Sequence, residues 1–238
     1  MGRWCYRQNF KGIIARKHIF VKGVEKKSKN LVVIMEKFEW KKAYKQLYFP
    51  PAQPVVVEVP PLHFLMIDGH GDPNKEESYQ EAVEMLFSLS YTLKFAVKKE
   101  QGFDYSVFPL EGLWWVKDMS QFTTNDKASW DWTMMIAQPE AIHEEWIENA
   151  KELVLKKRSD LGAIEKVRFE VYSEGLSVQL MHIGPYSAEG PNVARIHSYI
   201  HENGYEISGK HHEIYLSDVR RSAPEKLKTV IRQPICLS

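Results

Sequence analysis

The stretch His211-His-Glu-Ile-Tyr-Leu-Ser-Asp218 sets the pattern from which the rest of the chain is interpreted. Successive side chains of a β-strand point to opposite faces, so a strand here places His211, Glu213 and Tyr215 on one face. The other face carries apolar Ile214 and is expected to pack against helices. A carboxylate beside a phenol is unusual on a solvated face, which more often shows Lys, Thr or Ser. We therefore predict that the first face lines a binding site.

Apolar periodicity on both sides of this stretch predicts an alternation of strands and helices. The predicted strands are 55–59, 63–68, 105–117, 129–137, 166–172, 176–183, 211–216 and 229–235, and the predicted helices are 74–99, 139–161 and 191–204. The order of elements occurs twice, in pseudo-repeats at about 55–137 and 165–236, with an offset of roughly 115 residues. A two-fold repeat is a simple way to build one cleft lined by β-structure. We predict an α+β fold with a central ligand cleft.

The composition is typical of a globular protein. Of the 238 residues, 44% are hydrophobic and 26% are charged, which is enough apolar material for a substantial core. No apolar run reaches the length of about 18 residues that would predict a membrane span. The two cysteines, Cys5 and Cys236, lie at opposite ends of the chain, and a secreted protein usually carries a denser set of disulfides. We expect a cytoplasmic protein with no membrane partner.

The net charge of +1 hides a strongly basic N-terminal segment. Residues 1–34 hold nine Lys and Arg and one acidic residue, which leaves 23 basic and 30 acidic side chains in residues 35–238. An acidic domain without a basic stripe matches the phosphate backbone poorly, so we predict no direct nucleic-acid binding. We expect residues 1–34 to be a tail and 35–238 to be the domain. The tail is either a disordered basic arm or an upstream extension before a translation start at Met35.

Tryptophans cluster on two neighbouring predicted strands. Four of the seven lie between residues 114 and 132. Alternation aligns Trp130, Trp132 and Met134 on one face, and Trp115 comes from the adjacent strand. Such rings suit a flat hydrophobic ligand, although for any single tryptophan burial in the core is the commoner outcome. As a group they predict a cavity lined by aromatic rings.

Two glutamates are candidates for polar groups in this cavity. Within a pocket of aromatic rings, burial disfavours the charged carboxylate, so we expect the pKa of Glu213 to be raised and the group to act as a base near neutral pH. The alternative is a carboxylate at the rim, paired with Lys or Arg. Glu111 lies in the corresponding region of the first half, either in the pocket or in a turn before Gly112.

Three segments together resemble the stand-alone members of the GyrI-like small-molecule-binding family. They are Phe64-Leu-Met-Ile-Asp-Gly-His-Gly-Asp-Pro-Asn74, Pro109-Leu-Glu-Gly-Leu-Trp-Trp115, and the stretch from His211 with the following Pro224-Glu-Lys-Leu-Lys-Thr-Val-Ile-Arg-Gln-Pro-Ile235. The resemblance covers about residues 36–236. It implies duplicated strand–helix–strand–strand units that form two sheets around a central cleft, the effector-binding fold of bacterial transcription activators. We recognise no helix-turn-helix segment, so the resemblance implies ligand capture or chemistry without direct transcriptional control.

The Trp-Trp and His-His-Glu-Ile-Tyr elements together are similar to relatives that hydrolyse strained cyclopropane rings in aromatic, DNA-alkylating compounds. This resemblance implies detoxification, with Glu213 as the base that orients water and Tyr215 or Tyr186 as the hydrogen-bond donor. Trp115 and Trp132 are then the stacking walls. Strand alternation and position in the sequence, rather than the resemblance, add Glu111, Trp130, Met134, His182 and His211 as candidate ligand-binding residues. Ring strain supplies much of the driving force, so we expect no metal and no cofactor.

A binding protein without catalysis is the alternative from another class. In the drug-sensing relatives, the glutamate that matches Glu213 pairs with cationic aromatic compounds, so such a protein would sequester drugs or, as the family name suggests, contact DNA gyrase. A zinc site from His197, His201 and His211 is a further alternative, but the HExxH spacing is absent. The partner is in each case a hydrophobic aromatic small molecule. Monomer and homodimer both stay open.

Overall fold

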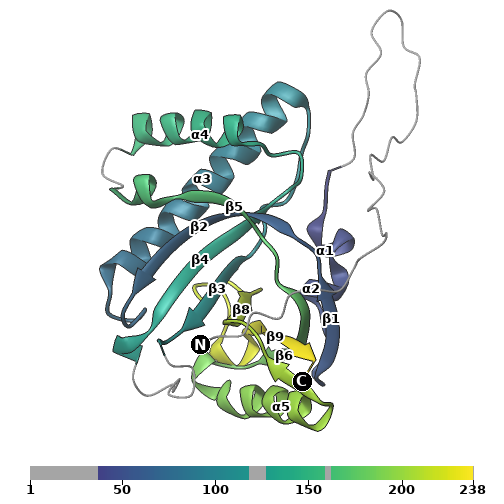
Figure 1. Ribbon diagram of the computed structural model, residues 1–238. Coiled ribbons are helices and arrows are strands. Elements are labelled where there is room, and N and C mark those ends of the chain that lie inside the picture. Colours follow the sequence, from purple (N-terminus) through teal and green to yellow (C-terminus); the bar gives the residue numbers. More distant parts are fainter. Residues whose placement is uncertain (1–36, 118–126, 159–161, 238) are drawn as a thin grey trace, which may run out of the picture.

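The computed structural model describes residues 37–117, 127–158 and 162–237 (Figure 1). The predicted tail, residues 1–34, and Met35 lie outside the described residues. A curled antiparallel sheet forms the centre of the molecule, with α3 (Glu77–Gln101) and α4 (Glu144–Lys157) at the top of Figure 1 and α5 (Gly190–Glu202) at the bottom. None of the described helices is long and apolar enough to cross a membrane.

The strands pair in the order β1-β6-β9-β8-β3-β4-β2-β5, and β7 pairs with β9. Their bounds are β1 Val55–Val59, β2 Leu62–His70, β3 Leu110–Trp115, β4 Asp131–Gln138, β5 Arg168–Tyr172, β6 Gly175–Ile183, β7 Tyr205–Ile207, β8 His211–Tyr215 and β9 Lys228–Leu237. Two short helices, α1 (Trp40–Ala43) and α2 (Lys45–Tyr48), precede β1. Each predicted strand and helix is present, and α4 is shorter at both ends than the predicted 139–161.

The sheet order has two matching halves. The strands β1, β2, β3 and β4 occupy the same relative places as β5, β6, β8 and β9. Each half begins with a strand that pairs in the other half, β1 with β6 and β5 with β2. The predicted α+β class is confirmed. The strands expected in two sheets form one continuous sheet, because β3 pairs with β8. Without this pairing, each of these strands would leave the backbone N–H and C=O groups of one edge without partners.

The helices α3 and α5 cover the two ends of the sheet. The helix α3 packs on β2 and β4, with Leu86 and Leu89 fully buried. The helix α5 packs on β6 and β9, where Ile196 and Ile231 belong to a second apolar cluster. Ile231 lies directly opposite Glu213 in the β8–β9 pair, so α5 covers the same face that carries Glu213. The central strands β3 and β8 are left between the two helices.

Two boundaries differ from the predicted ones for local reasons. The helix α3 begins at Glu77 rather than Asn74, because the carboxylate of Asp72 accepts hydrogen bonds from the backbone and side chain of Asn74 and holds it in a turn. The strand β3 begins at Leu110, directly after Pro109, which has no N–H to donate to a ladder. The elements α1, α2 and β7 were not predicted, because three or four residues leave no period to detect.

Candidate functional site

A groove lies between α3 and α5, and β3 and β8 contribute its floor. Its volume of about 1860 Å³ exceeds the roughly 300–1,000 Å³ usual for a pocket that holds one drug-sized ligand. The aromatic side chains that line it are Trp40, Phe49, Tyr79, Phe87, Tyr91, Phe108, Trp114, Trp130, Tyr186 and Tyr215. Glu189, His211 and Glu213 are among its polar groups. An aromatic groove with a few placed polar groups suits a flat, hydrophobic ligand.

Glu213 lies on the floor of the groove between two neighbours on its own strand. The hydroxyl of Tyr215 donates a hydrogen bond to Oε2 of Glu213 at 2.8 Å, and Nε2 of His211 lies 3.2 Å from Oε1. On the adjacent strand, Nε1 of Trp114 donates to the hydroxyl oxygen of Tyr215 at 3.0 Å. Alternate residues of β8 therefore share the face that lines the groove, as the strand period predicts.

Glu213 has a lowered pKa, so the expectation of a raised one is wrong. Burial raises the pKa of this carboxyl, but the hydrogen bond and charge of His211 and the hydrogen bond from Tyr215 outweigh burial. Strand alternation brings both of these groups to the carboxylate. Burial and the charge of Glu213 raise the pKa of Tyr215 well above its ordinary value, so this hydroxyl stays a neutral donor.

A second carboxyl, that of Glu189, also lines the groove and was not predicted. Glu189 is buried at the start of α5, and its Oε1 has no hydrogen-bond partner in the described part of the chain. Burial and the charge of Glu213 raise the pKa of Glu189 to about 9, against a smaller opposing influence of Thr229. In the sequence, Glu189 is marked only by its place directly before Gly190-Pro191. A glutamate at such a position is ordinarily interpreted as a solvent-exposed residue at the start of a helix.

Tyr186 forms part of the groove wall beside these carboxyls. Its ring lies edge-on to that of Tyr215, with centroids 5.5 Å apart and planes at 74°. Burial, followed by the charges of Glu189 and Glu213, raises the pKa of Tyr186 to about 12, which keeps its hydroxyl protonated. Because the hydroxyl of Tyr215 already donates to Glu213, Tyr186 is the better placed of the two predicted tyrosines to donate to a ligand.

The adjacent tryptophans of β3 point to opposite faces of the sheet. Trp114 lines the groove, edge-on to the predicted residue Trp130, with ring centroids 5.4 Å apart. Trp115, which was predicted as a stacking wall, lies on the other face, where Nζ of Lys210 is 3.2 Å from its ring centroid. The period of two permits only one of two neighbouring tryptophans on a given face. Pairing with β8 selects Trp114, which lies opposite His211.

Three other residues predicted to bind ligand lie outside the groove. Trp132 is fully buried and packs edge-on against Tyr79, which itself lines the groove. Met134 is fully buried in the main core. His182 is buried beside α5, with Nδ1 2.9 Å from Nδ2 of Asn192. Packing of α3 and α5 on the sheet covers these side chains, which strand alternation alone would leave facing a ligand.

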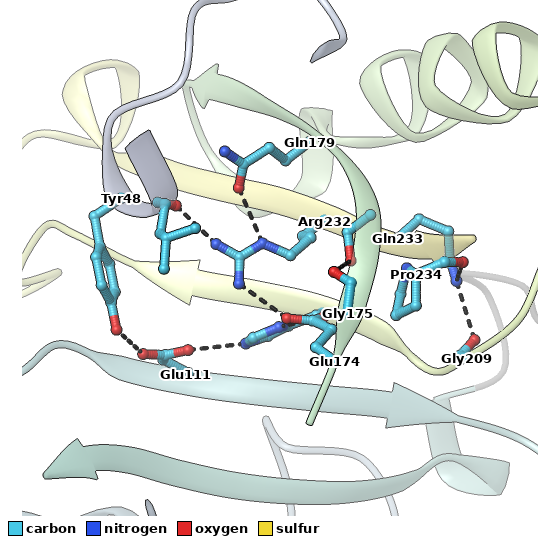
Figure 2. Close-up of polar contacts among 12 residues, drawn as sticks. Tyr48, Glu111, Glu174, Gly175, Gln179, Gly209, Arg232, Gln233 and Pro234 are labelled. Atoms are coloured by element: carbon cyan, nitrogen blue, oxygen red, sulfur yellow. Dashed lines mark hydrogen bonds and ion pairs between the residues drawn. The ribbon is translucent and has the colours of Figure 1, made fainter. Parts of the chain in front are cut away.

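Glu111 lies in a fully buried polar network on the face of β3 opposite the groove (Figure 2). The network consists of hydrogen bonds from Tyr48 Oη to Glu111 Oε1 (2.8 Å), His212 Nε2 to Glu111 Oε2 (3.0 Å), His212 Nδ1 to Glu174 Oε1 (2.9 Å), Arg232 Nη1 to Glu174 Oε2 (2.9 Å), Arg232 Nε to Gln179 Oε1 (2.9 Å) and Arg232 Nη2 to the carbonyl oxygen of Leu47 (2.7 Å). Glu111 therefore lies outside the groove, where it cannot contact a ligand directly.

The charges of this network balance. Both ring nitrogens of His212 face carboxylates, so both must donate and the ring is an imidazolium. Burial lowers the pKa of His212, but the charge of Glu174 and the hydrogen bonds that His212 donates to Glu111 and Glu174 raise it to about 9. With Arg232, two positive groups offset two negative ones, the condition under which buried charges are tolerated. The network holds β8 from the face opposite Glu213.

The zinc alternative involved three histidines. His197 and His211 line the groove, whereas His201 is exposed near the end of α5. Within residues 37–117, 127–158 and 162–237, no group of three or more His, Cys, Asp and Glu side chains is arranged to hold a metal ion.

Comparison with known proteins places this geometry among small-molecule-binding domains. The family model described as the GyrI-like small molecule binding domain matches residues 52–235. A structure described as an uncharacterized conserved protein from Listeria innocua is 41% identical, with a TM-score of 0.79, over 84% of this chain and 100% of its own. Two structures described as hydrolases from Listeria innocua are 38% and 39% identical, with TM-scores of 0.74 and 0.76 and the same coverage. No curated protein matches the chain.

Proposed function

This chain belongs to the GyrI-like small-molecule-binding family, and we propose that it binds flat, hydrophobic aromatic compounds in the groove and detoxifies them by hydrolysis. The observation that carries the proposal is the ionised carboxylate of Glu213, held by His211 and Tyr215 on the floor of an aromatic groove. A water bound beside this carboxylate has a proton acceptor within reach and aromatic walls that orient the other reactant.

The reaction that suits this site best is the opening of a cyclopropane ring conjugated to a carbonyl group. Glu213 accepts a proton from water, the water oxygen bonds to a ring carbon, and the electron pair of the broken bond moves to the carbonyl oxygen. Tyr186 donates a hydrogen bond to that oxygen, and Trp114 and Trp130 form the walls against which the ligand stacks. The lowered pKa makes Glu213 a weak base, so the reaction depends on ring strain and on orientation of the water rather than on basicity.

The comparisons support hydrolysis at a coarser level. Two of the Listeria innocua structures are described as hydrolases, and they are alike in fold to this chain over their whole length. The cyclopropane-bearing substrate class is our extension of that likeness, made from the residues of the groove. No metal or cofactor takes part in the proposed steps.

A second candidate is a binding protein that sequesters cationic aromatic compounds. The negative charge of Glu213 inside an aromatic groove favours this function, because ring faces and a carboxylate both attract cations. Sequestration needs no water beside Glu213 and no turnover. The two candidates therefore differ in whether the bound compound is changed.

The test is incubation with an aromatic alkylating compound that bears a cyclopropane ring, followed by mass spectrometry. We expect a product heavier than the substrate by one water, formed faster than in buffer alone. Glu213→Gln should lower turnover by about 10²-fold or more, the usual scale of general base catalysis. The control Glu58→Gln changes an exposed carboxylate on β1 and should have no effect. Tight binding without product would replace hydrolysis by sequestration.

A further inference from the structure

Two carboxyl groups from different elements meet in the groove. Glu213 comes from β8, and Glu189 comes from the residue before α5. The side chain of Glu213 is 15% exposed and the residue Glu189 is 6% exposed. Both carboxyls line the same groove, and the negative charge of Glu213 acts directly on Glu189.

The orientation of Glu189 differs from that of an ordinary helix-starting glutamate. A carboxylate at the N-cap usually accepts hydrogen bonds from the first backbone N–H groups and benefits from the helix dipole. Glu189 occupies the N-cap of α5, but its side chain makes no capping hydrogen bond. It lines the groove instead, with Oε1 buried and without a partner in the described residues. A buried polar atom without a partner is uncommon in a folded protein and calls for a functional explanation.

The surroundings of the pair decide which carboxyl holds the proton. Glu213 has both Tyr215 and His211 to stabilise its negative charge, whereas Glu189 has only the smaller influence of Thr229, and its Oε1 has no donor in the described residues. Two buried like charges in contact do not both ionise near neutral pH. The proton therefore resides on Glu189. The raised pKa of Glu189 and the lowered pKa of Glu213 agree with this assignment.

Other titratable and charged groups face the pair from each neighbouring element. They are His211 and Tyr215 on β8, Tyr186 before α5, His197 on α5, Tyr79 on α3 and Lys127 before β4. The three tyrosines have raised pKa values and stay neutral. Lys127 lowers the pKa of both carboxyls, and for each it is the weakest of the named influences. None of these groups reverses the order of the two pKa values, because that of Glu189 stays raised and that of Glu213 stays lowered.

From this arrangement we propose that Glu189 is the catalytic proton donor of the same site, paired with Glu213 as the proton acceptor. The inference rests on the proposed hydrolysis. Glu213 takes one proton from water as the water oxygen bonds to the ring carbon. The carbon–carbon bond breaks, its electron pair moves to the carbonyl oxygen, and the proton of Glu189 is transferred to that oxygen. Glu213 then passes its proton to Glu189, so both carboxyls return to their starting states and one water has been added.

The experiment compares Glu189→Gln with the wild type and with Glu202→Gln, an exposed glutamate on α5. Gln has the size of Glu and cannot supply a proton, so turnover should fall by about 10²-fold. Wild-type activity should decline as the pH rises through about 9, because the donor is then ionised, and this alkaline decline should vanish in Glu189→Gln. Glu202→Gln should match the wild type in rate and pH profile.

Infrared difference spectroscopy gives a readout that does not depend on turnover. Between neutral and alkaline pH, the wild type should lose the carbonyl band of one protonated carboxylic acid. A folded Glu189→Gln variant should lack that band. Absence of the band in the wild type at neutral pH overturns the inference.

The failures of the two proposals are distinguishable. If the wild type hydrolyses and Glu189→Gln retains both its rate and its alkaline decline, Glu189 is not the donor and the proposed function stands. If the wild type does not hydrolyse, the proposed function fails and the catalytic role of Glu189 fails with it.

Discussion

Gly112 lies directly opposite Glu213 in the β3–β8 pair. A Cβ atom at Gly112 would lie 2.8 Å from Nε1 of Trp114 and 3.2 Å from the hydroxyl oxygen of Tyr215. The indole of Trp114 therefore reaches Tyr215 across the space that a side chain at residue 112 would fill. The hydrogen-bonded chain that orients Glu213 depends on this missing side chain.

Gly112→Ala is expected to disturb the site more than the fold. The added methyl group pushes the indole of Trp114 away from Tyr215, at the cost of about 1–3 kcal/mol that overpacking typically carries. Turnover and ligand affinity should both decrease, and the melting temperature should fall by a few degrees. Gly162→Ala is the matched control, because no atom lies within 4 Å of a Cβ there. Unchanged turnover in Gly112→Ala would show that the hydrogen-bonded chain is dispensable.

Trp130→Ala should weaken ligand binding, whereas Trp115→Ala should not. Trp130 lines the groove, so its loss removes a stacking surface and should weaken binding of a flat ligand by about 1 kcal/mol or more. Trp115 lies on the other face, under Lys210, and its loss should leave affinity unchanged. Isothermal titration with the same aromatic compound measures both. If only Trp115→Ala weakened binding, the ligand would lie on the face opposite the groove, and the proposed binding site would be wrong.

Glu111→Gln should lower stability rather than remove a ligand contact. The change leaves His212 and Arg232 with one fewer buried negative partner, and breaking a buried pair typically costs about 3–5 kcal/mol. Urea unfolding measures the loss, and titration at a temperature where the variant is folded measures affinity. Full stability with lost binding would contradict the placement of Glu111 outside the groove.

Stability should decrease with alkaline pH because of His212. Its folded pKa of about 9 lies above the value of about 6.5 for an unfolded histidine. The stabilisation is therefore fully present below about pH 6.5 and is lost as the pH rises through about 9, and it amounts to roughly 3 kcal/mol. Urea unfolding between these pH values should show the decline.

Glu189 contributes to the same decline over a wider range and must be separated from His212. Its pKa is raised from 4.5 to about 9, so the protonated folded state loses relative stability as the pH rises from about 4.5 to 9. Glu189→Gln should remove this contribution over the whole range, which leaves only the decline due to His212 above about pH 6.5. A flat profile in Glu189→Gln would show that His212 is not charged in the folded protein.

Short-range patterns account for what the sequence alone determined. The strand over 55–59 has the predicted bounds, and His211, Glu213 and Tyr215 share one face because a strand has a period of two whatever surrounds it. The α+β class follows from the order of the elements. These features depend on residues close together in the chain, and local physics is sufficient to predict them.

Tertiary structure decided which face of each strand became the groove and which groups met there. Pairing of β3 with β8 selected Trp114 over Trp115, and packing of α3 buried Trp132. Glu189 lines the same groove as Glu213 because α5 packs on β6 and β9, and its pKa is raised by burial and by a charge 24 positions along the chain. Contacts between residues so far apart depend on register and packing of the whole fold, and no local period of the sequence carries that information.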